Sequence, residues 1–463
     1  MSTQGADVIV IGGGATGENA ASRAVEHGLD TVLVEAELLG GECSYWACMP
    51  SKALLRPGDA LATARRVPGA APAVTGGVDV DATLRSRDAF AGLDDAAQED
   101  WATSAGVRVL RGHGRLDGER RVTVKGTDGN QTTLEARRSV IIATGTRAAI
   151  PPIDGLTEAQ PWTNREATQI SEVPRRFAVL GGGVVGVELA QAFARLGSQE
   201  VTLFELEDRL LGPEEPFAGE DVEAALTADG VDVRTGTEVV GVTRQSDGTV
   251  SIDVEGAGPV VADELLVAVG RRSATHDLGL DTVGLEPGQP IEVDDALRAT
   301  GVTGGWLSAV GDVNGRNLLT HMGKYQARLA ADAIAGRDVK AWADSAASTR
   351  VVFTDPQVAA VGLTYASARE QGLSVEVFDV PTGGVAGGAL LGKDVPGTCR
   401  LVVDMDRSLV VGATFTGPGT SELLHAATIA IVGEVPLERL WHAVPAFPTV
   451  SEVWLRMLEA AGL

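Results

Sequence analysis

The chain has 463 residues, which is enough for two to four domains with well-packed cores. Its 63 acidic residues outnumber 38 Lys and Arg, and the net charge of −25 argues against nucleic acid and anionic membranes as partners. The sequence shows no signal-peptide pattern, no apolar run of membrane-spanning length and only three cysteines, so we expect a cytoplasmic protein without membrane insertion.

The first predicted unit is a strand, a glycine-rich turn, a helix and a second strand. Residues 7–11 form a short apolar run that is typical of a buried parallel strand. A G-x-G-x-x-G pattern follows at Gly12, Gly14 and Gly17. The first glycine permits a tight turn, the second lets backbone approach a pyrophosphate, and the third lets helix and strand pack closely. The second strand ends in Glu35, which can accept hydrogen bonds from a ribose, so we expect a dinucleotide site.

Two of the three cysteines lie together in the next stretch, residues 40–52. If a helix begins near Cys43, the side chains of Cys43 and Cys48 could meet across little more than one turn. A disulfide that closes so short a loop adds little stability, and such disulfides are the ones that cycle. Lys52 and a helix N-terminus under Cys43 would favour the thiolate. The alternative is two unrelated buried thiols, and because no histidine lies near them in sequence we expect no metal site.

The strand–glycine–helix–strand unit recurs in the middle of the chain. A strand at 177–180 leads into Gly181, Gly183 and Gly186, and a later strand ends in Glu205. A chance second match with this spacing is improbable, so we expect two dinucleotide sites. Glu205 would repel a 2′-phosphate and bond a free 2′-hydroxyl, which favours NAD over NADP. Arg209 either weakens that preference or is a solvated surface charge.

The remaining segments predict β-hairpins, a returning strand and a separate domain. Residues 107–145 are typical of β-hairpins, and a strand at 307–310 is followed by a helix at 319–334. From about residue 344, strands alternate with helices, which indicates an α+β domain. We expect its strands at 350–353, 374–380, 399–404 and 409–415 and its helices at 421–432 and 451–461. Cys399 lies in one of these strands and is expected to be a buried core thiol.

Taken together, these motifs resemble those of the flavoprotein disulfide reductases, the relatives of dihydrolipoamide dehydrogenase, glutathione reductase and mercuric reductase. The shared pattern is two dinucleotide folds, a C-x4-C followed by Pro-Ser-Lys, and an α+β tail, and it covers nearly the whole chain. Further matching motifs are Ala143-Thr144-Gly145, Val269-Gly270-Arg271-Arg272, Gly311-Asp312-Val313 and Val352-Phe353-Thr354-Asp355-Pro356. The resemblance implies an α/β fold with two Rossmann-like dinucleotide-binding domains, for FAD and NAD(P), plus a C-terminal α+β dimerisation domain.

The resemblance also implies the domain boundaries and the residues that contact the cofactors. The FAD-binding domain would comprise 1–150 and 273–343, the NAD(P)-binding domain 151–272, and the dimerisation domain of a homodimer 344–463. FAD would be contacted by Gly12, Gly14, Gly17, Glu35, Gly41, Lys52, Thr144, Gly145, Gly311, Asp312 and His321. A packed histidine without a cofactor role is the alternative for His321. The nicotinamide dinucleotide would be contacted by Gly181, Gly183, Gly186, Glu205, Gly270 and Arg271.

For catalysis, the resemblance implies a redox-active disulfide between Cys43 and Cys48. Cys48 would face the flavin and form a charge-transfer thiolate, and Cys43 would be the interchange thiol that meets the acceptor. Lys52 and Glu188 would form a pair beside the flavin ring, where Lys52 favours the reduced flavin.

The sequence departs from the family pattern on the acceptor side. Where the family has Cys-x-Asn-x-Gly-Cys, this chain has Tyr45 for the Asn and Ala47 for the Gly. Phe447 occupies the position of the family's acid/base histidine, while Glu452, which would orient that histidine, is retained. A phenyl ring cannot transfer a proton, so thiol–disulfide interchange would lose a factor of about 10² to 10⁴. His442 could substitute only if its loop were rebuilt.

We therefore expect electrons to pass from NAD(P)H, with NADH favoured, through FAD and the Cys43–Cys48 disulfide to an unidentified small-molecule acceptor. The aromatic residues Tyr45, Trp46 and Phe447 favour a flat or apolar acceptor such as a quinone. An unusual thiol or metal substrate is a further option, although mercury is not expected because the C-terminus lacks an extra cysteine pair. The sequence is also compatible with a diaphorase or quinone reductase in which the flavin reduces the acceptor directly, and with a low-turnover flavoprotein subunit.

Overall fold

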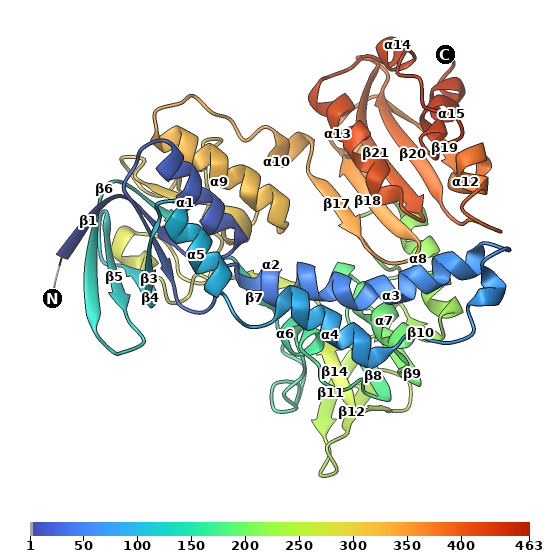
Figure 1. Cartoon of the computed structure of the whole chain (residues 1–463), viewed down its shortest axis with the longest axis horizontal. Helices are drawn as coiled ribbons and strands as arrows, with labels where there is room; N and C mark the ends of the chain where they lie inside the picture. The colour runs from blue at the N-terminus through green and yellow to red at the C-terminus, as the bar shows by residue number, and fades with distance from the viewer. Residues whose placement is uncertain (1–2) are drawn as a thin grey trace. The chain divides into compact units, whose positions relative to one another are not determined.

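The computed structural model describes residues 3–463, which fold into two compact units (Figure 1). The first unit contains the chain up to Met49 together with Phe90–Ala148 and Arg271–Asp344. The second unit contains Pro50–Ala89, Ala149–Gly270 and Ser345–Leu463. The predicted α/β fold class is confirmed. Compactness does not assign a ligand to a segment, so the three domains expected from the sequence, in four chain segments, stay predictions.

The first unit is built on a seven-stranded sheet with the order β3-β2-β1-β6-β5-β4, and β16 also pairs with β6. Its strands are β1 (Thr3–Ile11), β2 (Thr31–Glu35), β3 (Arg108–Arg111), β4 (His113–Leu116), β5 (Arg121–Lys125), β6 (Gln131–Ile142) and β16 (Leu307–Ala309). The pairs β1–β2, β1–β6, β2–β3 and β6–β16 are parallel. Parallel strands covered on both faces become continuous apolar runs, which explains why Val8, Ile9 and Val10 are all fully buried.

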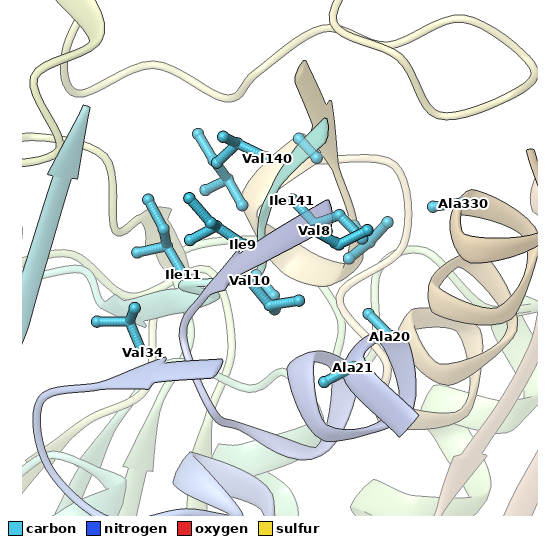
Figure 2. Close-up of a cluster of buried hydrophobic side chains, with 14 of the residues drawn as sticks. Val8, Ile9, Val10, Ile11, Ala20, Ala21, Val34, Val140, Ile141 and Ala330 are labelled. Atoms are coloured by element: carbon cyan, nitrogen blue, oxygen red, sulfur yellow. The ribbon is translucent and has the colours of Figure 1, made fainter. Parts of the chain in front are cut away.

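Helices α1 (Ala15–Glu26) and α9 (Thr320–Ile334) lie side by side in this unit. Figure 2 shows Ala20 and Ala21 of α1 and Ala330 of α9 near the apolar side chains of β1 and β6. All three alanines are fully buried, and their small size lets the helices approach closely. The same unit contains α2 (Gly41–Tyr45), α5 (Ala96–Ser104) and the strand pair β7 (Thr146–Ala148) and β15 (Arg271–Ser273).

The second unit contains a parallel four-stranded sheet with the order β10-β9-β8-β14 and a three-stranded sheet, β11-β12-β13. The strands are β8 (Arg176–Leu180), β9 (Glu200–Phe204), β10 (Val231–Arg234), β11 (Val239–Arg244), β12 (Val250–Val254), β13 (Val260–Ala262) and β14 (Glu264–Val267). The helices are α3 (Cys48–Arg66), which begins at the end of the first unit's opening segment, α4 (Val80–Ala91), α6 (Asn164–Thr168), α7 (Val184–Leu196) and α8 (Pro216–Ala228). Phe177 of β8 and Phe193 of α7 stack at 4.1 Å between ring centroids, which anchors the helix on the sheet.

The C-terminal part of the second unit is a five-stranded antiparallel sheet with the order β17-β18-β21-β20-β19. Its strands are β17 (Thr349–Val352), β18 (Gln357–Gly362), β19 (Val375–Pro381), β20 (Thr398–Asp404) and β21 (Leu409–Gly417). Nearby helices are α10 (Ala343–Ala346), α11 (Tyr365–Glu370), α12 (Ala386–Ala389), α13 (Leu424–Val432), α14 (Leu437–Leu440) and α15 (Glu452–Ala460). The sequence prediction lacked β18. Cys399 is fully buried in β20, as predicted.

The helix that the sequence analysis considered as a condition, beginning near Cys43 and including Cys48, does not form, because α2 ends at Tyr45 and a separate helix, α3, begins at Cys48. The proline ring of Pro50 would clash with the carbonyl of Trp46 in a continuous helix, whereas proline is tolerated in the first turn of α3.

Within residues 3–463, no helix is both long and apolar enough to cross a bilayer.

Candidate active site

The structure brings the two predicted redox cysteines together. Cys43 lies in α2, Cys48 is the first residue of α3, and both are half-buried free thiols that are hydrogen-bonded to each other. The Cys48 sulfur lies 3.4 Å from the hydroxyl oxygen of Thr320, the first residue of α9. The start of α9 therefore supports a dithiol that could close to a disulfide with only local movement.

The electrostatic surroundings of Cys43 differ from the sequence expectation. The hydrogen bond with Cys48 and burial together raise the pKa of Cys43 well above its ordinary value. Thr320, through a hydrogen bond, and Lys324, through its charge, act in the opposite direction and lower the pKa of Cys43. The expectation that local groups would favour the Cys43 thiolate was therefore wrong for the dithiol, because a shared proton between the sulfurs and burial outweigh the nearby positive charge.

The first glycine loop has the geometry that a pyrophosphate site requires. The Glu35 carboxylate accepts hydrogen bonds from Gly13 N and Glu37 N, both at 2.6 Å, while burial raises the pKa of Glu35. A Cβ on Gly17 would lie 1.8 Å from the Gly12 carbonyl oxygen, so the helix can pack on the turn only with glycine there. Gly14 caps α1 without a side-chain hydrogen bond, which leaves the first-turn N–H groups available to a phosphate.

The second glycine loop repeats this arrangement in the other unit. The Glu205 carboxylate accepts hydrogen bonds from Gly182 N at 2.6 Å and from Glu207 N at 2.9 Å. A Cβ on Gly186 would lie 1.9 Å from the Gly181 carbonyl oxygen, but a Cβ on Gly183 would meet nothing within 4 Å. The two units thus hold two equivalent sites, each with an open second glycine and a carboxylate at the end of the second strand.

Arg209 does not face a free site in this unit. Its guanidinium donates to the carbonyl oxygens of Leu211, Gly212 and Glu214, in the loop that follows it. These bonds hold the guanidinium on the backbone of its own loop, where it is poorly placed to neutralise a 2′-phosphate.

A buried polar chain surrounds Asp312. The Arg271 guanidinium donates to the Thr146 hydroxyl oxygen at 2.6 Å, and that hydroxyl donates to the Asp312 carboxylate at 2.9 Å. Burial raises the pKa of Asp312, and the Thr146 bond opposes the shift. Arg271 also lies 3.7 Å from the Glu42 carboxylate, so the structure places it in this cluster of the first unit.

Most of the remaining residues assigned to cofactors are close in sequence to Thr146, Arg271 or Asp312. Thr144 donates to the carbonyl of Ala274 at 3.0 Å, while Gly145 and Gly311 have φ of +69° and +76°, which favour glycine. The sequence assigned contacts to Gly41 and Gly270 as well, and both also have positive φ. His321 follows Thr320 and is exposed in the single chain, and both its assignment to FAD and the alternative of a packed histidine stay predictions.

The predicted lysine–glutamate pair forms in the second unit. The Lys52 ammonium lies 2.7 Å from a carboxylate oxygen of Glu188, whose side chain is buried. The other Glu188 oxygen accepts from Phe353 N at 2.9 Å, and the Lys52 ammonium lies 4.8 Å from the centre of the Phe353 ring. Glu188 and Phe353 thus contact the Lys52 ammonium, while 33% of the Lys52 side chain remains exposed. The exposed part is available to a ligand.

The C-terminal segment carries Phe447 and Glu452, and the assignment of Phe447 to the position of the family's histidine stays a prediction. The Phe447 side chain is 77% exposed, and Glu452, the first residue of α15, is buried. One Glu452 oxygen accepts from Arg456 at 2.7 Å, whereas the other is buried and has no hydrogen-bond partner within residues 3–463. A buried carboxylate oxygen without a donor is costly, so this oxygen of Glu452 is available to a donor that the described chain does not supply.

Sequence reasoning missed Thr320 and Lys324, which act on Cys43, and Glu18, on which Lys324 acts. Thr320 contacts both cysteines, and Lys324 lies one turn further along α9. Glu18 lies in the first turn of α1, and burial raises its pKa to about 7. A charged residue inside an alanine-rich helix was the available signal for Glu18, but nothing local in the sequence places α9 beside the cysteines.

Metal-ligand clusters are not a feature of this site. Among residues 3–463, no group of three or more His, Cys, Asp or Glu side chains is arranged to hold a metal ion.

Comparison with known proteins identifies consistent relatives. The sequence model described as pyridine nucleotide-disulphide oxidoreductase matches residues 6–335, and that of its dimerisation domain matches residues 348–458. Dihydrolipoyl dehydrogenase of Haloferax volcanii is 33% identical over 470 residues, covering 99% of this chain and 96% of the relative. Mercuric reductase of Streptomyces lividans is 33% identical over 450 residues, covering 95% and 93%.

Solved structures share the fold over nearly the whole length. The Cu(II) complex of RclA, an HOCl-induced flavoprotein disulfide reductase from Escherichia coli, matches with a TM-score of 0.85 and 22% identity, covering 98% of this chain and 99% of that one. LpdA from Mycobacterium tuberculosis matches with a TM-score of 0.85 and 24% identity, with the same coverage of 98% and 99%.

We predict that two glycines of the second loop fail in different ways. Gly186→Ala brings a methyl group against the Gly181 carbonyl and should cost about 1–3 kcal/mol of stability, seen as a lower melting temperature. Gly183→Ala meets no atom within 4 Å, so it should leave the melting temperature unchanged while weakening NADH binding roughly tenfold or more in a fluorescence titration. Equal effects of both variants on stability would contradict this division.

We predict that Glu18 makes stability depend on pH. Burial raises the pKa of Glu18 to about 7 from 4.5. Between pH 4.5 and pH 7, the folded state therefore keeps a proton on Glu18 that the unfolded state has lost. That stabilisation is complete below pH 4.5 and is lost as the pH rises through 7. The wild type should therefore lose up to about 3 kcal/mol relative to Glu18→Gln between pH 4.5 and 8, measured by thermal unfolding. A constant difference between the two proteins would contradict the assignment.

Proposed function

Because this chain belongs to the pyridine nucleotide-disulphide oxidoreductase family, we propose that it passes two electrons from NAD(P)H, through bound FAD and the Cys43–Cys48 pair, to a small-molecule acceptor. The chain is an enzyme of the flavoprotein disulfide reductase class, as its sequence resemblance implied. The observation that carries the proposal for the cysteines is their hydrogen-bonded contact beside Thr320 at the start of α9.

The residues of the first unit fit FAD. The open N-terminus of α1 with Gly14 suits the pyrophosphate, Glu35 suits the adenosine ribose, and the half-buried Asp312 carboxylate suits a ribityl hydroxyl. When bound, FAD accepts an electron pair from NAD(P)H and delivers it to the disulfide. Reduction breaks the Cys43–Cys48 bond and takes up two electrons and two protons to give the dithiol.

The second glycine loop supports NADH as the favoured reductant. Glu205 presents a carboxylate where a 2′-phosphate would have to lie, and it is held there by Gly182 N and Glu207 N. Arg209, the nearby positive charge, is occupied by the carbonyls of its own loop. Repulsion of the phosphate and a hydrogen bond to the free hydroxyl both act in favour of NADH.

Lys52 and Glu188 would orient and tune the redox centre. The carboxylate of Glu188, held by Phe353 N, fixes the Lys52 ammonium by an ion pair of 2.7 Å. A positive charge held in this way stabilises developing negative charge on a bound ring system without reorganisation. Lys52 would therefore favour the reduced form of the cofactor.

A homodimer is supported by the C-terminal part of the chain. Residues 348–458 match the family's dimerisation domain. Within this range, Ile429, Val432 and Val444 are 56%, 51% and 84% exposed in the single chain, and they are candidates for burial in an interface. A cytoplasmic location is supported by the low cysteine content.

The acceptor is proposed to be flat or apolar, such as a quinone. Phe447 is exposed where an acid/base group would serve disulfide interchange, and the Glu452 oxygen that would orient such a group is unpartnered within residues 3–463. An acceptor that needs no imidazole is consistent with these two observations. They also favour the second candidate function, a quinone reductase in which the flavin reduces the acceptor without the cysteines.

We predict that the cysteines lie on the electron path. An anaerobic NADH titration of the purified yellow protein should produce a long-wavelength charge-transfer band after two electrons, because a Cys48 thiolate would lie against the oxidised flavin. Cys48→Ser should abolish that band while leaving NADH binding intact.

Bleaching of the flavin without the band in the wild type would contradict this path. Turnover of Cys43→Ser separates the two candidate functions, because full quinone reduction by this variant would establish direct transfer from the flavin. Loss of quinone reduction would support passage through the dithiol.

We predict that Phe447→His increases the reduction of small disulfides. The imidazole could donate a hydrogen bond to the Glu452 oxygen that has no partner within residues 3–463. It could then transfer a proton to the interchange thiol. Turnover with lipoamide or glutathione disulfide should rise at least about tenfold in steady-state assays. Phe447→Leu is the matched control, and no difference between the two variants would show that the missing base is not the block.

A further inference from the structure

The first turns of three helices converge around Cys43. A Cβ on Gly41 in α2 would lie 2.8 Å from the Gly14 Cα at the start of α1, and a Cβ on Gly323 in α9 would lie 2.3 Å from the Thr16 hydroxyl oxygen of α1. Glycine at both positions lets the three chain segments meet at backbone distance. The residues that follow these contacts, Glu18 on α1 and Lys324 on α9, are therefore brought to the same place.

Lys324 is the positive charge that faces the interchange thiol. It lies one helical turn after Thr320, and residues four apart project from the same face of a helix. Its charge lowers the pKa of the Cys43 thiol. Within residues 3–463, no hydrogen bond or ion pair engages the Lys324 ammonium, so its field is not cancelled by a close carboxylate partner.

Glu18 is the negative charge that faces Lys324. One of its oxygens is buried and has no hydrogen-bond partner in the described part of the chain. The charged or titratable groups that act on Glu18 are Lys324 of α9, Glu35 of β2 and Asp95 of the segment before α5, and Glu18 in turn acts on Tyr45 of α2. Glu35 and Asp95 are engaged elsewhere, by backbone N–H groups and by Arg111, which leaves Glu18 and Lys324 as the two uncommitted charges.

We propose that Lys324 and Glu18 form a charge pair that sets the fraction of Cys43 present as thiolate, in a chain with no imidazole at position 447. This inference rests on the proposed function, in which Cys43 is the thiol that meets the acceptor. The thiolate is the reactive form of cysteine, and its proton would pass to water. Lys324 promotes that loss of a proton, and an ionised Glu18 offsets the charge of Lys324. Both are positioning residues, since they act through Cys43.

The charges of Lys324 and Glu18 are expected to have opposite effects on the fraction of Cys43 present as thiolate. Cys48 and burial hold the proton on Cys43, while Thr320 and Lys324 oppose them. On the element that carries Cys43, Glu42 lies 3.7 Å from Arg271, so these two charges largely offset each other. Removing the charge of Lys324 should therefore disfavour the thiolate, and removing the charge of Glu18 should favour it.

The test is the pH profile of Cys43 alkylation in the intact flavoenzyme. The protein is reduced with dithiothreitol, desalted anaerobically and pulsed with iodoacetamide between pH 7.0 and 10.5. This range covers the rising limb of the profile, because Cys48 and burial raise the pKa of Cys43. Cys43 and Cys48 are then distinguished by fragment ions of the tryptic peptide 24–52, which contains no internal Lys or Arg. Chemical reduction makes the result independent of electron transfer from NADH, so failure of this inference can be told from failure of the proposed function.

Lys324→Met should displace the rising limb of the Cys43 profile to higher pH by about one unit, a tenfold slower reaction at neutral pH. Glu18→Gln should displace the limb to lower pH, and Lys324→Arg should retain the wild-type profile. Lys340→Met, which removes an equal charge from a side chain that is 68% exposed, is the matched control and should not move the profile. Alkylation of the buried Cys399 reports any unfolding of a variant.

Opposite shifts of Lys324→Met and Glu18→Gln support the charge pair, since a merely structural defect would move both profiles in one direction. Shifts in the same direction would overturn the proposal. An unmoved profile of either variant would also overturn it, because the proposal requires both charges to act on Cys43.

Discussion

The close approach of backbone at glycine is the constraint on which the rest of this structure depends. In each unit, the last glycine of a G-x-G-x-x-G loop lies so near the carbonyl of the first that any Cβ would overlap it. Gly41 and Gly323 extend the same principle to α2 and α9, which carry Cys43 and Lys324. In the first unit, close contacts at these glycines therefore hold the dinucleotide loop next to α2 with Cys43 and to α9 with Lys324.

The chain uses the same local device twice and gives it different surroundings. Glu35 and Glu205 are held alike by two backbone N–H groups, so the carboxylates have equivalent positions in the two folds. The first loop lies against α2, which carries the Cys43 thiol. The second loop is followed in sequence by Arg209, whose guanidinium donates to backbone carbonyls of its own loop. Similar backbone geometry thus supports two dinucleotide sites, while the neighbouring residues decide what each site can do.

The acceptor side shows how one substitution changes the requirements on other residues. With Phe447 exposed in place of an imidazole, the Glu452 carboxylate keeps its position at the start of α15 but lacks a donor for one oxygen in the described chain. We propose that Cys43, which the resemblance makes the interchange thiol, then depends on groups of its own unit for its charge state. Lys324 acts on Cys43 and on Glu18, so these two charged side chains are the proposed source of that control.

The sequence by itself determined the fold class, the two dinucleotide units and the C-x4-C pair, because periodicity and glycine spacing are local properties of the chain. It also indicated the loss of the imidazole at Phe447, which a motif comparison reveals directly. The pair of Lys52 and Glu188, 136 positions apart, was implied by the family resemblance and by no local pattern. Only the tertiary structure separated α2 from α3 and placed Thr320 against Cys48 across 272 positions. Such contacts join segments with no shared local pattern, so packing of the helices and strands decides them.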